Sequence, residues 1–268
     1  MDIGNVFDIN IEGFPSLKEL HLNLGFFNCL SFKNLFALEH LSIKVPKSRK
    51  SNDPPNTILF KNIREHMPNI DGFFYGIDKS SKIFNLSVLK KELYLRNLIN
   101  EDLINCFSNE IETLHISQMT EETFTELINS YYFPNVLEFD INFCKLSKLE
   151  KGIFDRFSLI RKLIIYASYK NDPLIVEHDA FSNLKQLTCL ELRSNGIESL
   201  DKRTFSELVN LETLDLGNNL LEFIDENMFS SLKKLRNVDL SENKLEKLDP
   251  KSYFGLENLL GPFYSLKI

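Results

Sequence analysis

Apolar and polar residues alternate in short runs along this chain, and from residue 187 onward the runs recur every 24 residues. Leu187, Leu211 and Leu235 each open a segment in which apolar residues fall at the third and fifth following positions, as in LTCLELRSN. Alternation over four to six residues predicts a strand with one buried face. Its recurrence at a fixed step predicts that successive strands stack in parallel as the coils of a solenoid.

Two further residue types recur at fixed places in each segment. Asparagine follows the strand at Asn195, Asn219 and Asn243, where a buried amide can bond backbone groups that the turn leaves unpaired. An aromatic residue follows later, at Phe205 and Phe229, with a leucine three residues beyond it. We expect the asparagines to form a ladder between coils and the aromatic rings to fill the coil interior.

The segments share the motif L-x-x-(L/V)-x-L-x-x-N-x-(L/I)-x-x-(L/I), which resembles the leucine-rich repeat family. The later aromatic and leucine make it most similar to the extracellular 24-residue type of Toll-like receptors, Slit-like guidance proteins and secreted immune solenoids. The resemblance implies an α/β fold, a curved right-handed solenoid. A parallel β-sheet would line its concave face, and the convex side would be mostly irregular or short helical.

The repeat register extends backward over nearly the whole chain. Cys144 takes the ladder position in the repeat from Val136, and the repeats before Ile111 keep the strand alternation but lack the asparagine. We predict a single leucine-rich-repeat domain covering 1–268, since solenoid coils contact only their neighbours and leave no natural internal boundary. It would hold about ten repeats, starting near residues 17, 38, 70, 90, 111, 136, 160, 187, 211 and 235, with an incomplete one from 259.

Charge and motifs restrict the function classes. The net charge is −7 without a long basic or acidic run, so we expect no nucleic-acid partner. The sequence has no stretch of about 20 apolar residues, and therefore no transmembrane segment is expected. It lacks G-x-S-x-G, P-loop and H-E-x-x-H motifs, and His21 and His40 have no evident further ligands for a metal. We expect no enzyme activity, cofactor or metal.

The chain ends and the cysteines bear on the compartment. Extracellular members of the family typically carry cysteine-rich caps, which neither end has, and the N-terminus lacks the pattern of a signal peptide. The first expectation is a piece of a longer receptor ectodomain or secreted protein, and the alternative is a complete intracellular solenoid. Asn85-Leu86-Ser87 is a sequon that would carry a glycan only in a secreted chain. The four cysteines are scattered and are expected to be free thiols.

Binding residues are expected among the strand positions that face away from the core. Phe74 and Tyr94 should be neighbours on adjacent strands, and Ile164 with Tyr166 should form a second apolar spot. The alternative is a register slip that places Phe74 in the core. The insertion between Val45 and Ile58 is a further candidate binding loop, or an ordinary excursion of the chain.

Three acidic residues, Glu191, Asp215 and Asp239, should stack on adjacent strands about 4.8 Å apart. Like charges so close would favour a basic partner. The alternative is that Asp between strand leucines is a common feature of the family and that Arg193 offsets part of the charge.

The resemblance implies a non-enzymatic protein–protein recognition module, either a ligand-binding ectodomain or a secreted protein, with glycan or lipid as less favoured ligands. An intracellular adaptor, such as the substrate-recognition arm of a ubiquitin ligase, is the alternative. A regulator similar to the ribonuclease inhibitor is disfavoured, since that subfamily has longer helix-bearing repeats and many cysteines.

Overall fold

The computed structural model describes residues 8–23, 29–45, 57–59, 67, 70, 72–77, 83–87, 91–96, 104–105, 108–166, 173–245, 256 and 265–267. The chain divides into two compact units, unit 1 (1–111) and unit 2 (112–268). Each is described by itself, and the organisation as one continuous domain stays a prediction. Most of the insertion before Ile58, residues 46–56, lies outside the described residues.

Unit 1 contains a mixed sheet in the strand order β2-β4-β6-β7-β8. The strands are β2 (Glu19–Asn23), β4 (His40–Val45), β6 (Gly72–Ile77), β7 (Ile83–Ser87) and β8 (Glu92–Arg96). The β2-β4 and β4-β6 pairs are parallel, in the register that the sequence pattern predicts, with His21 opposite Ser42 and Ser42 opposite Phe74. Strand β7 was not expected, and it runs antiparallel to both of its neighbours.

The return segments of unit 1 form a second sheet. Its parallel strands are β1 (Asp8–Glu12), β3 (Cys29–Lys33) and β5 (Thr57–Leu59), in the order β1-β3-β5. The sequence analysis expected irregular or helical return segments, so this sheet is an addition to the predicted fold. A short 3₁₀ helix, η1 (Ser108–Glu110), precedes the end of the unit.

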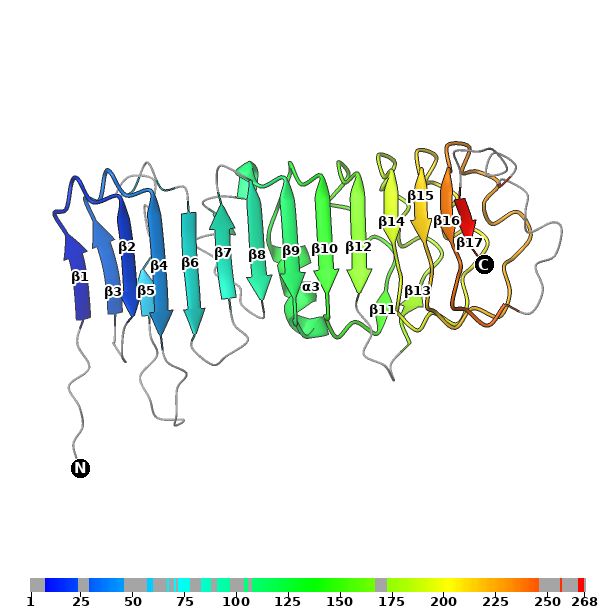
Figure 1. The fold of residues 1–268 in the computed structure, drawn as a ribbon, viewed down its shortest axis with the longest axis horizontal. Coiled ribbons are helices and arrows are strands. Elements are labelled where there is room, and N and C mark those ends of the chain that lie inside the picture. Colours follow the sequence, from blue (N-terminus) through cyan, green and yellow to red (C-terminus); the bar gives the residue numbers. More distant parts are fainter. Residues whose placement is uncertain are drawn as a thin grey trace, which may run out of the picture. The chain divides into compact units, whose positions relative to one another are not determined.

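Unit 2 is a solenoid with one parallel sheet in the order β9-β10-β12-β14-β15-β16-β17 (Figure 1). The strands are β9 (Thr113–Ser117), β10 (Glu138–Asn142), β12 (Lys162–Tyr166), β14 (Cys189–Glu191), β15 (Thr213–Asp215), β16 (Asn237–Asp239) and β17 (Ser265–Lys267). Pairing follows the predicted register from β9 to β16. Ser265 pairs with Asn237, a step of 28 residues, so the last strand lies four residues beyond the place that the 24-residue period gives.

The core of unit 2 lies between this sheet and the return segments. Alternate strand residues such as Leu114, Phe139 and Leu190 are fully buried, because each strand exposes only its other face. Rings from the return segments stack along the coil axis: the centroid of Phe181 lies 6.1 Å from that of Phe154 and 6.5 Å from that of Phe205. The motif's aromatic residues at Phe154, Phe181 and Phe205 thus form a continuous column inside the solenoid.

Three short elements complete the return side of unit 2. Helix α3 (Glu121–Ser130) begins after Thr120, whose Oγ accepts a hydrogen bond from the backbone N–H of Thr123 at 3.2 Å. The helix buries Phe124, Leu127 and Ile128 on one face, the spacing of an amphipathic helix. Strands β11 (Lys148–Leu149) and β13 (Ile175–Val176) pair in parallel in the following coils. The predicted parallel-sheet solenoid is confirmed.

Candidate recognition surface

The predicted aromatic pair of unit 1 is not on adjacent strands. In the sheet register, Phe74 on β6 lies opposite Asn85 on β7, and Asn85 lies opposite Tyr94 on β8. The prediction that Phe74 and Tyr94 are direct neighbours is therefore wrong, because the segment Ile83–Ser87 pairs as a strand between them. The side chains of β6 and β7 lie outside the described residues, while that of Tyr94 is 38% exposed.

In unit 2, the side chains that alternate with the buried ones form three columns across the sheet, here called the solvent face. The first column is Thr113, Glu138, Lys162, Cys189, Thr213 and Asn237; the second is His115, Asp140, Ile164, Glu191, Asp215 and Asp239; the third is Ser117, Asn142, Tyr166, Arg193, Gly217 and Ser241. All the unit 2 residues predicted to bind a ligand belong to this face.

The structure brings the predicted apolar spot and the predicted acidic row together. Ile164 is the register partner of Glu191, and the Tyr166 hydroxyl donates a hydrogen bond to Oε2 of Glu191 at 3.3 Å. Lys162 Nζ lies 3.8 Å from Oε1 of the same carboxylate. Glu191 therefore joins the aromatic end of β12 to the acidic residues of β15 and β16.

The guanidinium of Arg193 lies across the acidic row. Its Nη1 is 3.9 Å from Asp215 Oδ1 and 3.9 Å from Asp239 Oδ2, and its Nη2 pairs with Glu242. The guanidinium of Arg193 can lie there because residue 217 is a glycine: a Cβ at that residue would lie 2.2 Å from Nη1. Arg193 therefore offsets part of the acidic charge, as the alternative interpretation of the row predicted.

Two of the acidic residues also have a local structural role. Asp215 Oδ1 accepts a hydrogen bond from the backbone N–H of Gly217 at 2.8 Å, and Asp239 Oδ1 accepts one from that of Ser241 at 3.0 Å. A carboxylate that bonds the N–H two residues onward stabilises the turn that follows the strand. These aspartates therefore serve the fold as well as the charge of the surface.

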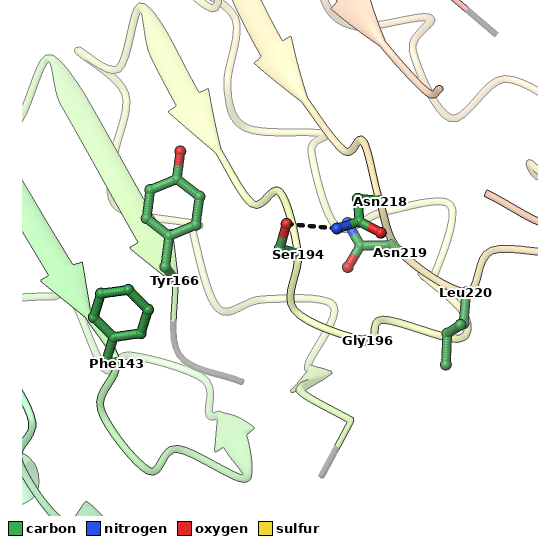
Figure 2. Close-up of a pocket in the computed structure, with 7 residues that line it drawn as sticks. All are labelled: Phe143, Tyr166, Ser194, Gly196, Asn218, Asn219 and Leu220. Carbon is green, nitrogen blue, oxygen red and sulfur yellow. Dashed lines mark hydrogen bonds between the residues drawn. The ribbon is translucent and has the colours of Figure 1, made fainter. Parts of the chain in front are cut away.

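A pocket of about 570 Å³ opens beside the solvent face, at the carboxyl ends of β12, β14 and β15 (Figure 2). Phe143 and Tyr166 form one side, and the polar side chains of Ser194 and Asn218 stand opposite them. Asn218 Nδ2 donates a hydrogen bond to Ser194 Oγ at 2.9 Å. The remaining lining residues are Gly196, Asn219 and Leu220.

Phe143 has an unusual backbone for its type. Its φ is +52°, in the left-handed region that bulky residues rarely adopt, and its side chain is 59% exposed. The residue preceding the ladder position has a positive φ in the neighbouring coils too, at Gln118, Ser194, Asn218 and Glu242. Phe143 is the single aromatic residue in this row among the described coils. The sequence did not single out Phe143, because the repeat motif leaves this position unspecified.

The pKa values on this surface reflect burial and negative charge. Burial, followed by the charge of Glu191, raises the pKa of the Tyr166 hydroxyl above its usual value. The same two causes, in the same order, raise the pKa of the Cys189 thiol to about 11. Both groups are therefore neutral near pH 7, and Cys189 is a poor nucleophile there.

The ladder residues lie at the turn that follows each strand. Asn219 Oδ1 accepts hydrogen bonds from the backbone N–H groups of Asn195 at 3.0 Å and Ile197 at 3.1 Å. Its Nδ2 donates to the carbonyl oxygens of Leu192 and Leu216, both at 2.9 Å. One buried side chain thus satisfies backbone groups of two successive coils.

The other two asparagines also bond backbone groups, and the bonds of Asn243 repeat the pattern just described one coil further on. Asn195 Nδ2 donates to the carbonyl oxygen of Ile165 at 2.6 Å, and Asn243 Oδ1 accepts from the backbone N–H of Leu221 at 3.1 Å. Cys144 is fully buried and is a free thiol, and burial raises its pKa to about 11.

Neither a metal site nor a bilayer-spanning helix is found in the part of the chain that the structure describes. No three His, Cys, Asp or Glu side chains gather there in the arrangement of a metal site. His115 Nδ1 and Asp140 Oδ2 lie 2.7 Å apart on the solvent face without a third such group. None of the described helices combines the length and hydrophobicity needed to cross a bilayer.

The fold and its repeats define a parallel-sheet solenoid of the leucine-rich-repeat class. Residues 170–221 and 209–260 match the family model described as leucine rich repeat. Residues 170–260 are therefore leucine-rich repeats, and these repeats resemble those of Toll-like receptors. No curated protein sequence matches it.

Similar solved structures agree with this class. Toll, from the glycosylated form of the Drosophila Toll–Spätzle complex, is 17% identical with a TM-score of 0.52, over 82% of this chain and 30% of the Toll chain. A leucine-rich-repeat protein of Leptospira interrogans is 20% identical with a TM-score of 0.51, over 83% of this chain and 47% of that protein. At these identities the likeness concerns the fold. The chain spans less than half the length of either protein.

The exclusion of nucleic acid as a partner is wrong. It depended on the charge balance alone, whereas TLR13, a similar chain, was solved in complex with ssRNA13. TLR13 is 20% identical with a TM-score of 0.45, over 93% of this chain and 44% of the TLR13 chain.

Proposed function

We propose that this chain is a recognition module without a catalytic step of its own, and that it binds a polypeptide ligand at the solvent face and adjoining pocket of unit 2. Toll, one of the similar structures, was solved with Spätzle, which supports a recognition role for the fold. The predicted contact residues are Ile164, Tyr166, Glu191, Asp215 and Asp239, to which we add Phe143.

The observation that carries the proposal is the exposed ring of Phe143 on a left-handed backbone at the mouth of the pocket. A left-handed conformation costs a non-glycine residue about 1–2 kcal/mol. The ring is 59% exposed, so little burial offsets that cost. The neighbouring described coils adopt the same conformation with a polar residue at this place, so the exposed aromatic ring is what sets Phe143 apart. Exposed aromatic rings are frequent contact anchors.

The location of the pocket supports the same function. The pocket lies outside the carboxyl ends of the parallel strands, which is where open α/β sheets bind their ligands. The pocket volume of about 570 Å³ lies within the usual range for ligand pockets. Its aromatic side offers apolar contact, and its Ser194–Asn218 side offers hydrogen bonds.

Selection of peptides from a random displayed library on the purified chain tests the proposal. We expect enriched peptides whose binding falls at least about tenfold in Phe143→Ala and Tyr166→Ala. The matched control is Phe223→Ala, which removes another exposed phenylalanine, 56% exposed, that does not line the pocket. Peptides that bind all three variants equally would refute the site, and binding to a glycan array or lipid vesicles in place of peptides would refute the ligand class.

We further propose that the chain is part of an ectodomain or a secreted protein, with Asn85 as its glycosylation site, and that Phe74 and Tyr94 add contacts in unit 1. The mass of the native protein from its source cells, before and after enzymatic removal of N-glycans, tests the compartment. A mass well above 31.2 kDa that falls on deglycosylation is expected. An unshifted mass near 31.2 kDa would favour the intracellular adaptor.

A further inference from the structure

The solvent face of unit 2 carries an excess of negative charge. From β9 to β16 its three columns hold five carboxylates and two permanent cations: Glu138, Asp140, Glu191, Asp215 and Asp239 against Lys162 and Arg193. On β17, Lys267 is the register partner of Asp239 and adds a third basic residue. Glu242 adds a sixth carboxylate beside Arg193. Such a surface raises the local concentration of cationic groups and steers them during association.

The acidic row already holds a cationic side chain of this chain itself. The guanidinium of Arg193 is within 4.0 Å of Asp215 and Asp239 and pairs with Glu242. This arrangement shows that carboxylates on adjacent strands converge on one guanidinium. The row is thus spaced to receive basic side chains that approach along the face.

The acidic row and the pocket are contiguous. Tyr166 lines the pocket with its ring, and its hydroxyl bonds Glu191, the first carboxylate of the row. A ligand with an apolar group against Phe143 and Tyr166 therefore has Glu191 beside that group.

The far side of the pocket suits a peptide backbone. Asn218 Nδ2 and Ser194 Oγ are bonded to each other. Among the described residues, Asn218 Oδ1 and the Ser194 hydroxyl hydrogen have no other hydrogen-bond partner. They provide one acceptor and one donor, the pair that a peptide group requires.

From this arrangement we infer that the ligand is a polypeptide segment in which one large apolar side chain is flanked by Lys or Arg. The apolar side chain occupies the pocket against the rings of Phe143 and Tyr166, and the basic residues pair with Glu191 and the acidic row. This inference rests on the proposed function and specifies the chemistry of its ligand.

The chain contains no Trp, so a peptide with one Trp gives a fluorescence signal with no tryptophan background. The probes are three blocked pentapeptides in which a central Trp is flanked by two Lys, two Glu or two Gly on each side. Titration of each with the purified full chain at low ionic strength, followed by Trp emission and anisotropy, gives the affinities. We expect the Lys-flanked peptide to bind at least about tenfold tighter than the Glu-flanked peptide, with a preference that declines as salt rises.

Variants with opposite expected signs sharpen the test. Glu191→Gln should weaken binding of the Lys-flanked peptide several-fold, and Arg193→Gln should tighten it, because it removes a cation that competes for the row. Phe143→Ala should weaken all three peptides, and Phe223→Ala should weaken none. Circular dichroism and thermal unfolding of each variant separate a lost site from a lost fold.

Equal affinity for the Lys- and Glu-flanked peptides, with both lost in Phe143→Ala, would overturn the basic ligand and leave the recognition site standing. If no peptide binds, or if binding is unchanged in Phe143→Ala and Glu191→Gln, the inference is overturned. The selection from the displayed library then tests the proposed function separately. Displacement of the bound peptide by a single-stranded RNA oligonucleotide would also overturn it, by assigning the pocket to a nucleic acid.

Discussion

Two kinds of coil occur in unit 2, and they differ at the turn after the strand. The repeats from Leu187 and Leu211 place buried Asn195 and Asn219 there, whereas those from Ile111 and Val136 place fully buried Met119 and Cys144. The asparagines bond backbone groups of two successive coils through their amides.

The coils without asparagine pair much of the turn backbone with itself, and the Cys144 thiol adds one bond, from Sγ to the carbonyl oxygen of Asn142 at 3.6 Å. The N–H of Lys145 donates to the carbonyl oxygen of Met119 at 2.9 Å, and the N–H of Leu146 donates to that of Cys144 at 2.9 Å. A buried turn must satisfy its polar backbone groups, but the partner can be a side chain or the backbone. The ladder asparagine is therefore one of two solutions, while the apolar strand positions and the phenylalanine column are common to both kinds of coil.

The shared phenylalanine column should have the largest effect on stability. Phe205 is fully buried and its ring stacks on that of Phe181. Phe205→Ala should lower the free energy of unfolding by about 3–5 kcal/mol through lost burial and a cavity. Denaturant unfolding measures the loss, and the exposed Phe223→Ala should change it by less than about 0.5 kcal/mol. A small loss for Phe205→Ala would mean that the coils do not depend on the column.

The coil with Cys144 should lose stability at high pH because its thiol is buried. Burial raises the pKa of this thiol from 9.0 to about 11 in the folded chain. Below pH 9 the thiol is protonated in both states. Between about pH 9 and 11 only the unfolded state ionises readily, so stability falls as pH rises, by up to about 2–3 kcal/mol from this group.

Unfolding of the native chain and of Cys144→Ala at several pH values from 8 to 11 measures this contribution. Other groups titrate in both proteins, so the difference between the two slopes isolates the thiol. Parallel slopes would contradict the burial of Cys144.

Removal of a ladder amide should separate the two kinds of coil. Asn219→Ala leaves backbone N–H groups of Asn195 and Ile197 without their acceptor. We expect a loss of about 1–3 kcal/mol in the free energy of unfolding. Asn237→Ala is the matched control, since this exposed side chain has one long contact, 3.4 Å, with Thr213. An unchanged unfolding curve for Asn219→Ala would show that the backbone groups of this turn find other partners, as they do in the coil with Cys144.

The sequence predicted the sheet of unit 2 better than that of unit 1, for a physical reason. A period of 24 residues with two strand leucines admits one register, because a slip by one residue would expose every leucine. In unit 1, by contrast, Ile83–Ser87 and the strands of the second sheet have no repeated partner motif. Whether such a segment forms a strand depends on which sheet edge lies beside it in the folded chain. The local sequence does not determine that.

The candidate site was predictable only in part. Tyr166 and Glu191 followed from strand alternation, which fixes the face that each residue occupies. Phe143 and Asn218 lie after the strands, where the backbone turns into the left-handed region and alternation no longer gives the side-chain direction. Predicting the directions of these two side chains would have required knowing that this turn position has a positive φ in successive coils.

Gly217→Ala tests the arginine that lies across the acidic row, with a smaller expected effect. The new Cβ would displace the flexible end of Arg193 from Asp215 and Asp239. Partly exposed ion pairs contribute about 0.2–1 kcal/mol, so we expect a loss of that size. In an Arg193→Ala background the same change should cost nothing, and equal losses in both backgrounds would place the strain in the backbone of Gly217 instead.

Phe143→Asn should have the smallest effect on stability and separates stability from recognition. Asn218 occupies the equivalent place with φ of +52°, the same value as Phe143, and asparagine tolerates this conformation better than phenylalanine does. We expect the free energy of unfolding to stay constant or rise by about 0.5 kcal/mol, because the lost ring is mostly exposed, whereas peptide binding at the pocket should fall. Phe139→Asn, at a fully buried position four residues earlier, should instead destabilise the fold by several kcal/mol. A loss above about 1 kcal/mol for Phe143→Asn would mean that the ring packs to hold the coil together, and the strained backbone would then be explained by stability instead of ligand contact.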